Sequence, residues 1–378
     1  MSSRVNQKRE HPPLPDVHAH NVIAEYGDDA MVIRPAPNAK SNLPFWARFA
    51  LMNTWLGTMH LSVIWVLTSI TFLVAPASTV YTRLLALAAL AVFFTLSLTE
   101  LGCFDEPIPR FGYVFTNFID KMCCNWFPIE VILEGRKHWH DHGVGPRIVA
   151  YEPHSLLPLG FIAFVTESGL LPKNMAARWY VCGTSAIFRV PILKHLWGWS
   201  QTRAVSKGVM ADIIKKGATA VVCPGGVAEC MHMTDNGATE VAFLNKRKGF
   251  VKLALEHDVP LCPSVGIGQT ATLDFYIPGP PLFSHKAVEK FARFIGFVPL
   301  AFWGIMGCPV PHRRPMRIVV GRPVEVPPQQ PGEDAASERR IEELHRRYVT
   351  ALTELYDRHR ELAVRELGCV APKKLRIV

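Results

Sequence analysis

The sequence lacks the cysteine pattern of a secreted or zinc-binding protein. Its nine cysteines are an odd number, and none forms a CxxC pair. Cys182, Cys223 and Cys262 lie within apolar, strand-like runs, as buried free thiols in a reducing compartment do. Residues 1–42 contain no apolar core of their own, so we expect no secretory signal peptide.

Further absences narrow the class of function. No Gly-x-Ser-x-Gly nucleophile elbow is present, which counts against a covalent lipid hydrolase or transacylase using Ser155 or a cysteine. Zinc-finger spacing, RNA-binding signatures and basic stripes interleaved with aromatics are also missing, so we expect no nucleic-acid partner. His138, His140 and His142 alternate as ligands on a strand would, but no fourth ligand accompanies them. We therefore expect no metal site.

Charged residues are scarce for a soluble protein. They make up 19% of the chain, apolar residues make up 49%, and the mean hydropathy is +0.14. This combination indicates membrane segments joined to a charged soluble part. The net charge of +9 suits an anionic membrane surface or a phosphate-bearing cofactor. With 378 residues, the chain is long enough for one large domain or two of ordinary size.

Two apolar runs stand out near the N-terminus. Residues 56–75 and 84–98 each approach the ~20 residues that cross hydrocarbon, and only a short segment separates them. We expect a transmembrane helical hairpin over residues 51–99, with a pair of buried core helices as the alternative. Basic residues lie mostly outside the hairpin, so both ends should face the cytosol. Residues 1–44 are then a mobile cytosolic tail.

The rest of the chain divides into three parts. We expect an irregular interfacial segment over 100–146 and an α/β domain over 147–326. A C-terminal amphipathic helix and tail should cover 327–378. Strand-like and helical stretches alternate in the middle part, which favours a mostly parallel sheet. Its expected strands cover residues 147–151, 178–182, 219–223, 259–267 and 317–321.

Two apolar patterns belong to the C-terminal half. The run 291–311 is broken by glycine and proline, so we interpret it as membrane-embedded or core rather than as a third span. The helix expected over 336–366 has an apolar side formed by Ile341, Leu344, Tyr348, Leu352 and Leu355.

The most informative stretch follows the first expected strand and contains Glu152, Pro153, His154 and Ser155. Pro153 ends the strand because proline cannot donate to the ladder. The apolar run 156–165 then predicts a buried or membrane-facing helix, so His154 lies at a strand-to-helix junction. An imidazole with an unperturbed pKa of about 6.5 can accept a proton from a hydroxyl near neutral pH. A structural histidine bound to a carbonyl is the alternative.

Other loops after expected strands are also polar or rich in glycine. Ligand sites of α/β sheets form at the carboxyl ends of strands. Gly225 and Gly226 let main-chain N–H groups approach a ligand closely, and we expect them to hold an oxyanion. Arg189, Arg247 and Lys248 are candidates for binding the phosphates of a nucleotide-type carrier.

Together these blocks resemble the type-2 diacylglycerol acyltransferase family, which also holds monoacylglycerol and wax-alcohol acyltransferases. The similarity covers about residues 45–365. It is carried by the hairpin and by the segments 152–155, 224–229, 247–255, 294–299 and 355–359. Animal members have His-Pro-His-Gly where this chain has Glu152-Pro153-His154-Ser155, and this variant resembles the plant and algal branch.

The resemblance implies a glycerolipid-acyltransferase-like fold and transfer of an acyl group from acyl-CoA to diacylglycerol, with no cofactor beyond this co-substrate. His154 matches the family's presumed catalytic base. Broader glycerolipid acyltransferases carry an Asp five residues later, where this chain has Leu159. Glu229 and Glu152 are candidates for orienting His154 instead, and Glu229 is preferred. The residues expected to bind substrate are Ser155, Arg189, Gly225, Gly226, Arg247 and Lys248.

Several alternatives stay open at this point. The acceptor can be monoacylglycerol or a long-chain alcohol, because acceptor choice depends on the shape of a pocket. A non-enzymatic scaffold on a lipid surface would explain the hairpin but not the site motifs. We expect the endoplasmic reticulum membrane as the location, with the lipid droplet surface as a second one. A homo-oligomer is left open.

Overall fold

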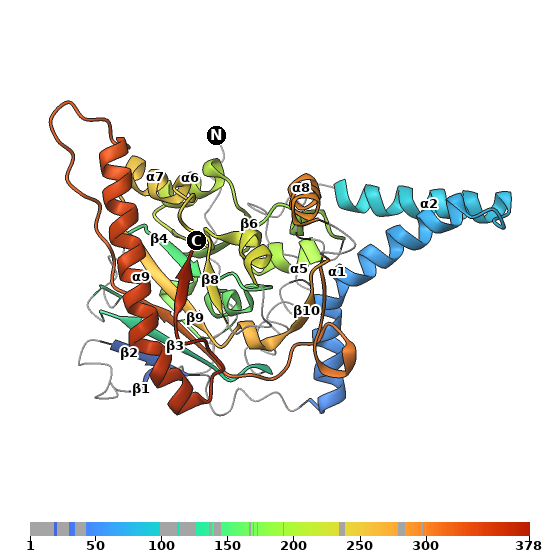
Figure 1. Cartoon of the computed structure of the whole chain (residues 1–378), viewed down its shortest axis with the longest axis horizontal. Helices are drawn as coiled ribbons and strands as arrows, with labels where there is room; N and C mark the ends of the chain where they lie inside the picture. The colour runs from blue at the N-terminus through green and yellow to red at the C-terminus, as the bar shows by residue number, and fades with distance from the viewer. Residues whose placement is uncertain are drawn as a thin grey trace, which may run out of the picture.

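The computed structural model describes residues 19–20, 30–34, 43–98, 112, 126–135, 138–139, 145–165, 168, 170–171, 173–191, 193–233, 239–278, 284–295, 298 and 300–378. In these residues a β-sheet lies between helices, and a helical pair projects from one side (Figure 1).

Nine strands form the main sheet of the described chain, in the order β1-β2-β3-β12-β9-β4-β7-β5-β6. Neighbours from β9 to β6 are parallel, whereas β12 is antiparallel to β9 and β2 is antiparallel to β3. The sheet is therefore largely parallel but mixed. The strands are β1 (Ala19–His20), β2 (Ala30–Ile33), β3 (Ile129–Glu134), β4 (Ile148–Glu152), β5 (Trp179–Gly183), β6 (Arg203–Ala204), β7 (Thr219–Val222), β9 (Leu261–Ile267) and β12 (Met316–Val320).

The side chains of β4 alternate between two apolar cores. Val149 and Tyr151 belong to the core on one face of the sheet, and Ile148 and Ala150 belong to the core on the other. A strand buried on both faces gives a continuous apolar run, which is why it is recognisable in the sequence. The five expected strands are confirmed as β4, β5, β7, β9 and β12, with small shifts of their ends.

Helices cover both faces of the sheet. Most of the helical residues in the first core come from α1 (Phe45–Val74), the 3-10 helix η4 (Leu159–Phe164) and α5 (Leu193–Trp199). The helices contributing to the second are α6 (Lys207–Lys215), α7 (Gly249–His257) and α9 (Glu338–Leu367). The remaining helical elements are α2 (Val80–Leu98), α4 (Lys173–Ala176), η6 (Ile187–Arg189), η7 (Gly226–His232), η8 (Thr270–Thr272), α8 (His285–Ile295) and η9 (Ile305–Gly307).

Within the described residues, α1 and α2 are the two helices long and apolar enough to cross a membrane. They project from the body of the molecule, and their outer parts expose large apolar side chains such as Leu67, Phe72 and Leu85 (Figure 1). The base of α1 differs, because Met52 and Trp55 are no more than 5% exposed and belong to the core. The prediction of a membrane hairpin therefore did not include the contribution of its first helix to the core of the α/β domain.

Two strands correct the sequence expectations. β2 lies inside the segment predicted to be a mobile tail, and β3 lies inside the one predicted to be irregular. Both are buried, and β3 pairs in parallel with β12. Glu130 interrupts the apolar run of β3, and for this reason the strand was not recognised from the sequence. Its carboxylate forms ion pairs with Arg317, which occupies the paired position on β12 at 2.6 Å, and with Arg34 at 2.5 Å.

Further differences concern short elements. The helix expected over 156–165 is only the 3-10 helix η4, which is buried. The expected C-terminal tail ends in β13 (Leu375–Ile377), which pairs in parallel with β8 (Glu240–Ala242). In the run 291–311, β11 (Ala301–Trp303) pairs with β10 (Asp274–Tyr276).

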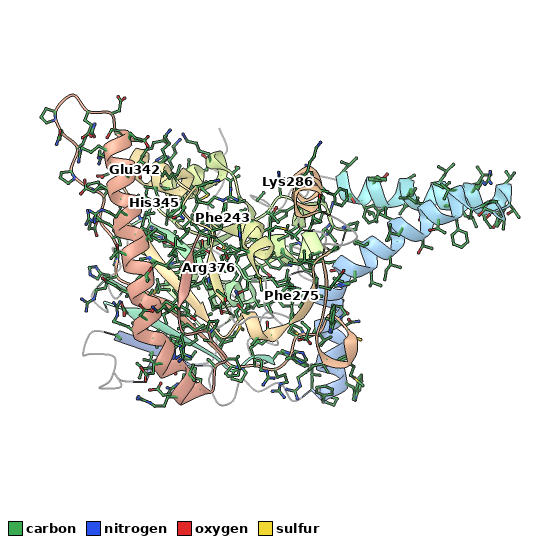
Figure 2. All side chains as sticks on the ribbon, in the orientation of Figure 1. Phe243, Phe275, Lys286, Glu342, His345 and Arg376 are labelled. Atoms are coloured by element: carbon green, nitrogen blue, oxygen red, sulfur yellow. The ribbon has the colours of Figure 1, made fainter. Side chains whose placement is uncertain are left out.

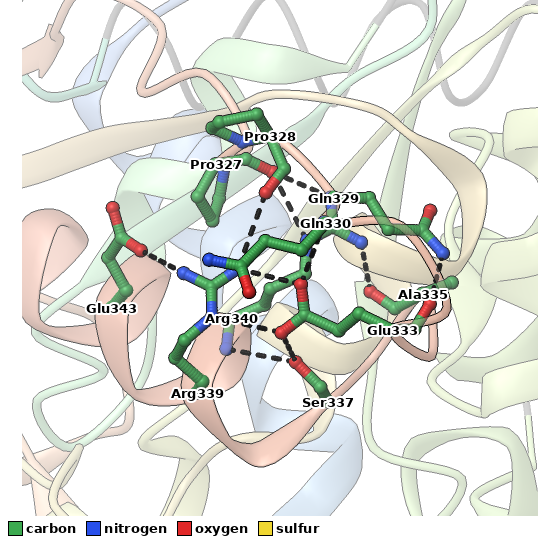
Figure 3. Close-up of polar contacts among 10 residues, drawn as sticks. All are labelled: Pro327, Pro328, Gln329, Gln330, Glu333, Ala335, Ser337, Arg339, Arg340 and Glu343. Carbon is green, nitrogen blue, oxygen red and sulfur yellow. Dashed lines mark hydrogen bonds and ion pairs between the residues drawn. The ribbon is translucent and has the colours of Figure 1, made fainter.

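The amphipathic helix α9 is confirmed, and every residue of its predicted apolar side is buried. Its start is fixed by polar contacts (Figure 3). The hydroxyl of Ser337 accepts from the N–H of Arg340, as an N-cap does, and the buried guanidinium of Arg340 donates to the carbonyl of Pro327 at 2.7 Å. Hydrogen bonds from Arg339 lower the pKa of Glu333 to about 2. The proline-rich segment is thereby attached to the start of α9.

Candidate active site

The candidate site lies where three neighbouring parallel strands end. Strands β9, β4 and β7 are adjacent and parallel, so their carboxyl ends meet at one edge of the sheet. β4 is followed by His154 and Ser155, β7 by the segment 223–229, and β9 by Gln269 and Thr270. Hydrogen bonds connect all three loops.

The imidazole of His154 is held by a main-chain carbonyl. Its Nδ1 lies 2.9 Å from the oxygen of Ser155. A carbonyl oxygen only accepts, so Nδ1 carries the proton and Nε2 keeps its lone pair. Burial lowers the pKa of His154 below 6.5, and the bond to Ser155 opposes this only in part. His154 is therefore neutral near pH 7, with Nε2 able to accept a proton.

Of the two residues expected to orient His154, Glu229 contacts its main chain, and Glu152 accepts from the N–H of Gly225 instead. Leu159 occupies the position at which the broader glycerolipid acyltransferases are expected to carry an aspartate. It is apolar and buried in η4. Glu229 accepts a hydrogen bond from the main-chain N–H of His154. The ring itself is held by Ser155, whose φ of 53° turns the chain in the left-handed region. Glu229 thus positions the loop, and the carbonyl of Ser155 sets the tautomer.

Glu152 and Glu229 form a buried carboxyl pair beneath this loop. Both side chains are fully buried and are hydrogen-bonded to each other. Burial raises the pKa of each carboxyl, and the charge of Glu152 raises the pKa of Glu229 further. Two carboxylates this close hold a proton between them. The pair therefore carries less negative charge than two separate glutamates.

The main chains of Gly225 and Gly226 are hydrogen-bonded to buried side chains next to this carboxyl pair. The N–H of Gly225 donates to Glu152 at 2.8 Å, and the main chain of Gly226 is hydrogen-bonded to Cys223. A Cβ at Gly225 would lie 1.8 Å from Oε1 of Glu229, so the carboxyl requires a glycine there. Both groups therefore already have partners within the protein, and the expectation that they hold an oxyanion stays a prediction.

Glu152, Cys223 and Glu229 have ligand atoms within 4.8 Å of one another, a spacing that a metal ion can bridge. Their four carboxyl oxygens, however, already accept hydrogen bonds from main-chain N–H groups and the Cys223 thiol. The potential metal-ligand atoms of these residues are therefore already engaged in a hydrogen-bonded network. Of the histidines weighed as metal ligands from sequence, His140 and His142 lie outside the described residues.

Ser155 faces the protein interior. Its side chain is buried, and its hydroxyl lies 2.6 Å from that of Thr270, which donates to Glu240 at 2.6 Å. Burial raises the pKa of Glu240 to about 7. The expectation that Ser155 binds substrate stays a prediction, and the structure gives its hydroxyl a partner in Thr270. Burial also raises the pKa of Cys230 to about 12, so neither group is placed or activated as a nucleophile.

The three candidate cations occupy different surroundings. The exposed Arg247 lies over the ring of Phe243 at 5.3 Å, and the N–H of Phe243 donates to Glu229 at 2.9 Å. Lys248 pairs with Glu342 of α9, the helix that also carries His345 (Figure 2). Arg189 is exposed in η6 and makes no ion pair within the described residues. Of the three, only Arg247 is connected to the site.

Gln269 is the residue that sequence reasoning missed. It is 1% exposed, and its Nε2 donates to the carbonyls of Pro153 at 3.0 Å and His154 at 3.3 Å. Its Oε1 accepts from the hydroxyl of Tyr151 at 2.8 Å and the N–H of Gly160 at 2.7 Å. Gln269 therefore holds the His154 loop on both sides. A signal was present, because Gln269 lies two residues after an expected strand.

An apolar cleft borders the same loop. It encloses about 430 Å³, including space open to solvent, and is lined by residues of α1, η4, β5 and α5. Trp55 of α1 stacks with Trp197 of α5 at a ring distance of 6.0 Å, and both line the cleft. Pro158 and Leu159, from the segment after His154, form another part of its wall.

Comparison with known proteins identifies the family. Residues 78–366 match the family model of the diacylglycerol acyltransferases. The chain belongs to the diacylglycerol acyltransferase family. The matched segment contains the whole candidate site, and the resemblance inferred from the motifs is confirmed.

Individual relatives of this diacylglycerol acyltransferase family member are moderately similar. Diacylglycerol O-acyltransferase 2 of Xenopus tropicalis is 28% identical over 62% of this chain and 66% of its own length. Acyl-CoA wax alcohol acyltransferase 2 of Mus musculus is 30% identical over 56% of this chain and 65% of its own. The chain thus spans just under two thirds of the length of these relatives.

One solved structure also aligns with the chain. The 1-acyl-sn-glycerophosphate acyltransferase of Thermotoga maritima covers 81% of this chain and 97% of its own, at 13% identity and a TM-score of 0.33. That score is too low to support a conclusion about the fold.

Proposed function

We propose that the chain is a membrane-bound acyl-CoA:diacylglycerol O-acyltransferase that makes triacylglycerol. The observation that carries this proposal is the tautomer of His154, whose Nε2 lone pair is left at the carboxyl ends of three parallel strands. Family membership supports the same chemistry.

The reaction follows from this geometry in two proton transfers. Nε2 of His154 accepts the proton of the acceptor hydroxyl as its oxygen attacks the thioester carbonyl carbon. The tetrahedral intermediate then collapses, the carbon–sulfur bond breaks, and His154 returns the proton to the leaving thiolate of CoA. No covalent enzyme intermediate and no cofactor beyond acyl-CoA are required.

The other site residues take supporting roles in this proposal. Arg247, exposed beside the site, binds phosphates of CoA from the cytosolic side. Lys248 contributes less, since Glu342 already compensates its charge. Glu152 and Glu229 hold the loop of His154 through main-chain N–H groups.

The location is part of the proposal. The hairpin of α1 and α2 anchors the chain in the endoplasmic reticulum membrane with both ends cytosolic, and the lipid droplet surface is a second location. Membership of the plant and algal branch stays a prediction from the sequence Glu-Pro-His-Ser. A homo-oligomer also stays a prediction.

A second candidate differs only in the acceptor. One similar protein is named a wax alcohol acyltransferase, so a long-chain alcohol or monoacylglycerol is the alternative to diacylglycerol. A non-enzymatic lipid scaffold is less well supported, because it has no use for a histidine held in one tautomer.

Replacement of His154 tests the proposal directly. General-base catalysis contributes about 10²- to 10⁴-fold, so His154→Ala should lose at least that factor in kcat. His154→Gln keeps a hydrogen-bonding side chain but cannot take up the proton, and should be nearly as inactive. The assay is transfer from labelled acyl-CoA to diacylglycerol by purified protein in detergent.

His257→Gln, at the end of α7, is the matched control and should retain full activity. If His154→Gln keeps most of its activity, the general-base mechanism is wrong. Isolation of a labelled acyl-enzyme after incubation with acyl-CoA alone would point to a covalent route instead.

A further inference from the structure

The apolar cleft contains two polar atoms that nothing in the described chain satisfies. The hydroxyl of Thr202 and Nε1 of Trp197 are buried and have no hydrogen-bond partner within the described residues. Thr202 is 0% exposed, and both residues line the cleft. Buried polar atoms are rarely left unpaired, so each unpaired one requires an explanation. A ligand oxygen in the cleft would supply the missing partner.

The cleft connects the membrane anchor with the site. Trp55, in its wall, belongs to α1, whose outer part exposes apolar side chains. Pro158, in the opposite part of the wall, is four residues after His154, so their Cα atoms are at most roughly 14 Å apart. A long apolar chain that enters from the lipid side and follows this wall would bring its head toward His154.

The two polar atoms lie away from the reacting centre. Thr202 directly precedes β6, which is three strand positions from β4, on the order of 14 Å along the sheet. The thioester carbonyl of acyl-CoA must lie at His154 to be attacked. The other carbonyls of acyl-CoA that could reach this distance are the two amides of its polar pantetheine arm, which a mostly apolar cleft disfavours. We therefore assign a carbonyl near Thr202 to the acceptor. A long-chain alcohol has no carbonyl, whereas diacylglycerol has two ester carbonyls.

We propose that this cleft binds an acyl chain of the diacylglycerol acceptor, with Trp197 and Thr202 donating hydrogen bonds to its ester carbonyl. The inference rests on the proposed function and names the subsite that selects an esterified acceptor. Apolar walls with a few polar groups are the usual composition of a lipid-binding pocket. Ester selection thus depends on Trp197 and Thr202.

Two conservative variants test this subsite. Trp197→Phe removes the N–H and keeps an aromatic ring, and Thr202→Val removes the hydroxyl with little change in shape. Each should raise the KM for diacylglycerol about 3- to 10-fold, the loss expected for one hydrogen bond. The KM for acyl-CoA, and the activity with a long-chain alcohol acceptor, should stay unchanged.

The controls are residues that do not line the cleft. Trp199→Phe lies on the same helix α5, and Thr353→Val lies on α9; both should match the unmodified protein. A raised KM for acyl-CoA would mean that the donor chain occupies the cleft and would overturn the inference. An equal effect on the alcohol acceptor would overturn it as well.

Binding is also measured without turnover, by labelling the purified protein with a photoactivatable diacylglycerol. Labelling should be several-fold weaker in both variants than in the controls, and unchanged labelling would overturn the inference. If the protein transfers no acyl group but labelling still depends on Trp197 and Thr202, the proposed function fails while the subsite stands.

Discussion

The tautomer of His154 depends on a carbonyl oxygen rather than on a carboxylate. A carboxylate partner would raise the pKa of the imidazole through its charge and would itself titrate, whereas the neutral oxygen of Ser155 offsets only part of the lowering by burial and does not titrate. The ring is therefore held in one orientation, and its pKa, lowered by burial, stays below 6.5. A neutral base at neutral pH results without a charged partner.

The pH dependence of the reaction should reflect this. Only neutral His154 accepts a proton, and its pKa lies below 6.5, so kcat should be flat from pH 8 to 6.5 and fall below that range. Glu240, with a pKa of about 7, titrates nearby. In a Glu240→Gln variant the acid limb of the kcat profile should persist. An activity loss centred near pH 7 that Glu240→Gln abolishes would assign the limb to Glu240.

Gln269 gives a second prediction about a single residue. Gln269→Leu removes both donors and acceptors that hold the loop of His154, and a misplacement of about 1 Å costs roughly 10²-fold in rate. We expect kcat to fall 10- to 100-fold, with a smaller change in the KM for acyl-CoA. Gln330→Leu, exposed before α9, is the control. A change confined to KM would argue against positioning.

The sequence predicted the place of the site better than its contacts. The rule that ligand sites lie at carboxyl ends of strands located His154 and Glu229 on adjacent loops. It could not show that Gly225 donates inward to Glu152 or that Ser155 faces Thr270. Such directions depend on φ and ψ and on partners from distant strands, which no local pattern contains.

Among the elements, β3 shows why one central strand escaped prediction. Its register places Glu130 opposite Arg317, and both are buried. A charge within an apolar run argues against a strand unless its partner is known, and that partner is far away in the sequence. Helix α9 was predictable because its apolar face repeats at helical spacing over its whole length.

This ion pair should matter for stability. Glu130→Ala leaves the fully buried Arg317 with Glu366 as its remaining carboxylate, and removal of one partner of a buried pair costs about 3–5 kcal/mol. Thermal unfolding in detergent should show a clear fall in midpoint temperature. Glu343→Ala, which breaks a pair at the surface of α9, should shift the midpoint far less. Equal shifts would contradict a special role for the buried pair.

Considered as a whole, the molecule does not separate into an anchor and a catalytic body. The base of α1 contributes Met52 and Trp55 to the core, and the buried Lys194 of α5 donates to carbonyls at the end of α2. A cation there also suits the negative end of the helix dipole. Both ends of the hairpin are therefore fixed to the α/β domain.

Removal of the hairpin should consequently fail to give a folded soluble domain. A chain beginning after residue 98 lacks Trp55, which stacks on Trp197, and loses part of the core. We expect such a chain to aggregate or to lack cooperative unfolding by circular dichroism. A soluble, cooperatively folded fragment would show that α1 is dispensable for the core.

The shared helix α1 also makes the surrounding lipid a thermodynamic partner in folding. A bilayer that accommodates the exposed half of α1 favours the conformation in which its buried half is docked, as any ligand of the native state does. Unfolding of the α/β domain and the loss of membrane contacts are then coupled equilibria. The thickness and composition of the host membrane would act on the geometry of the acceptor cleft through one continuous helix.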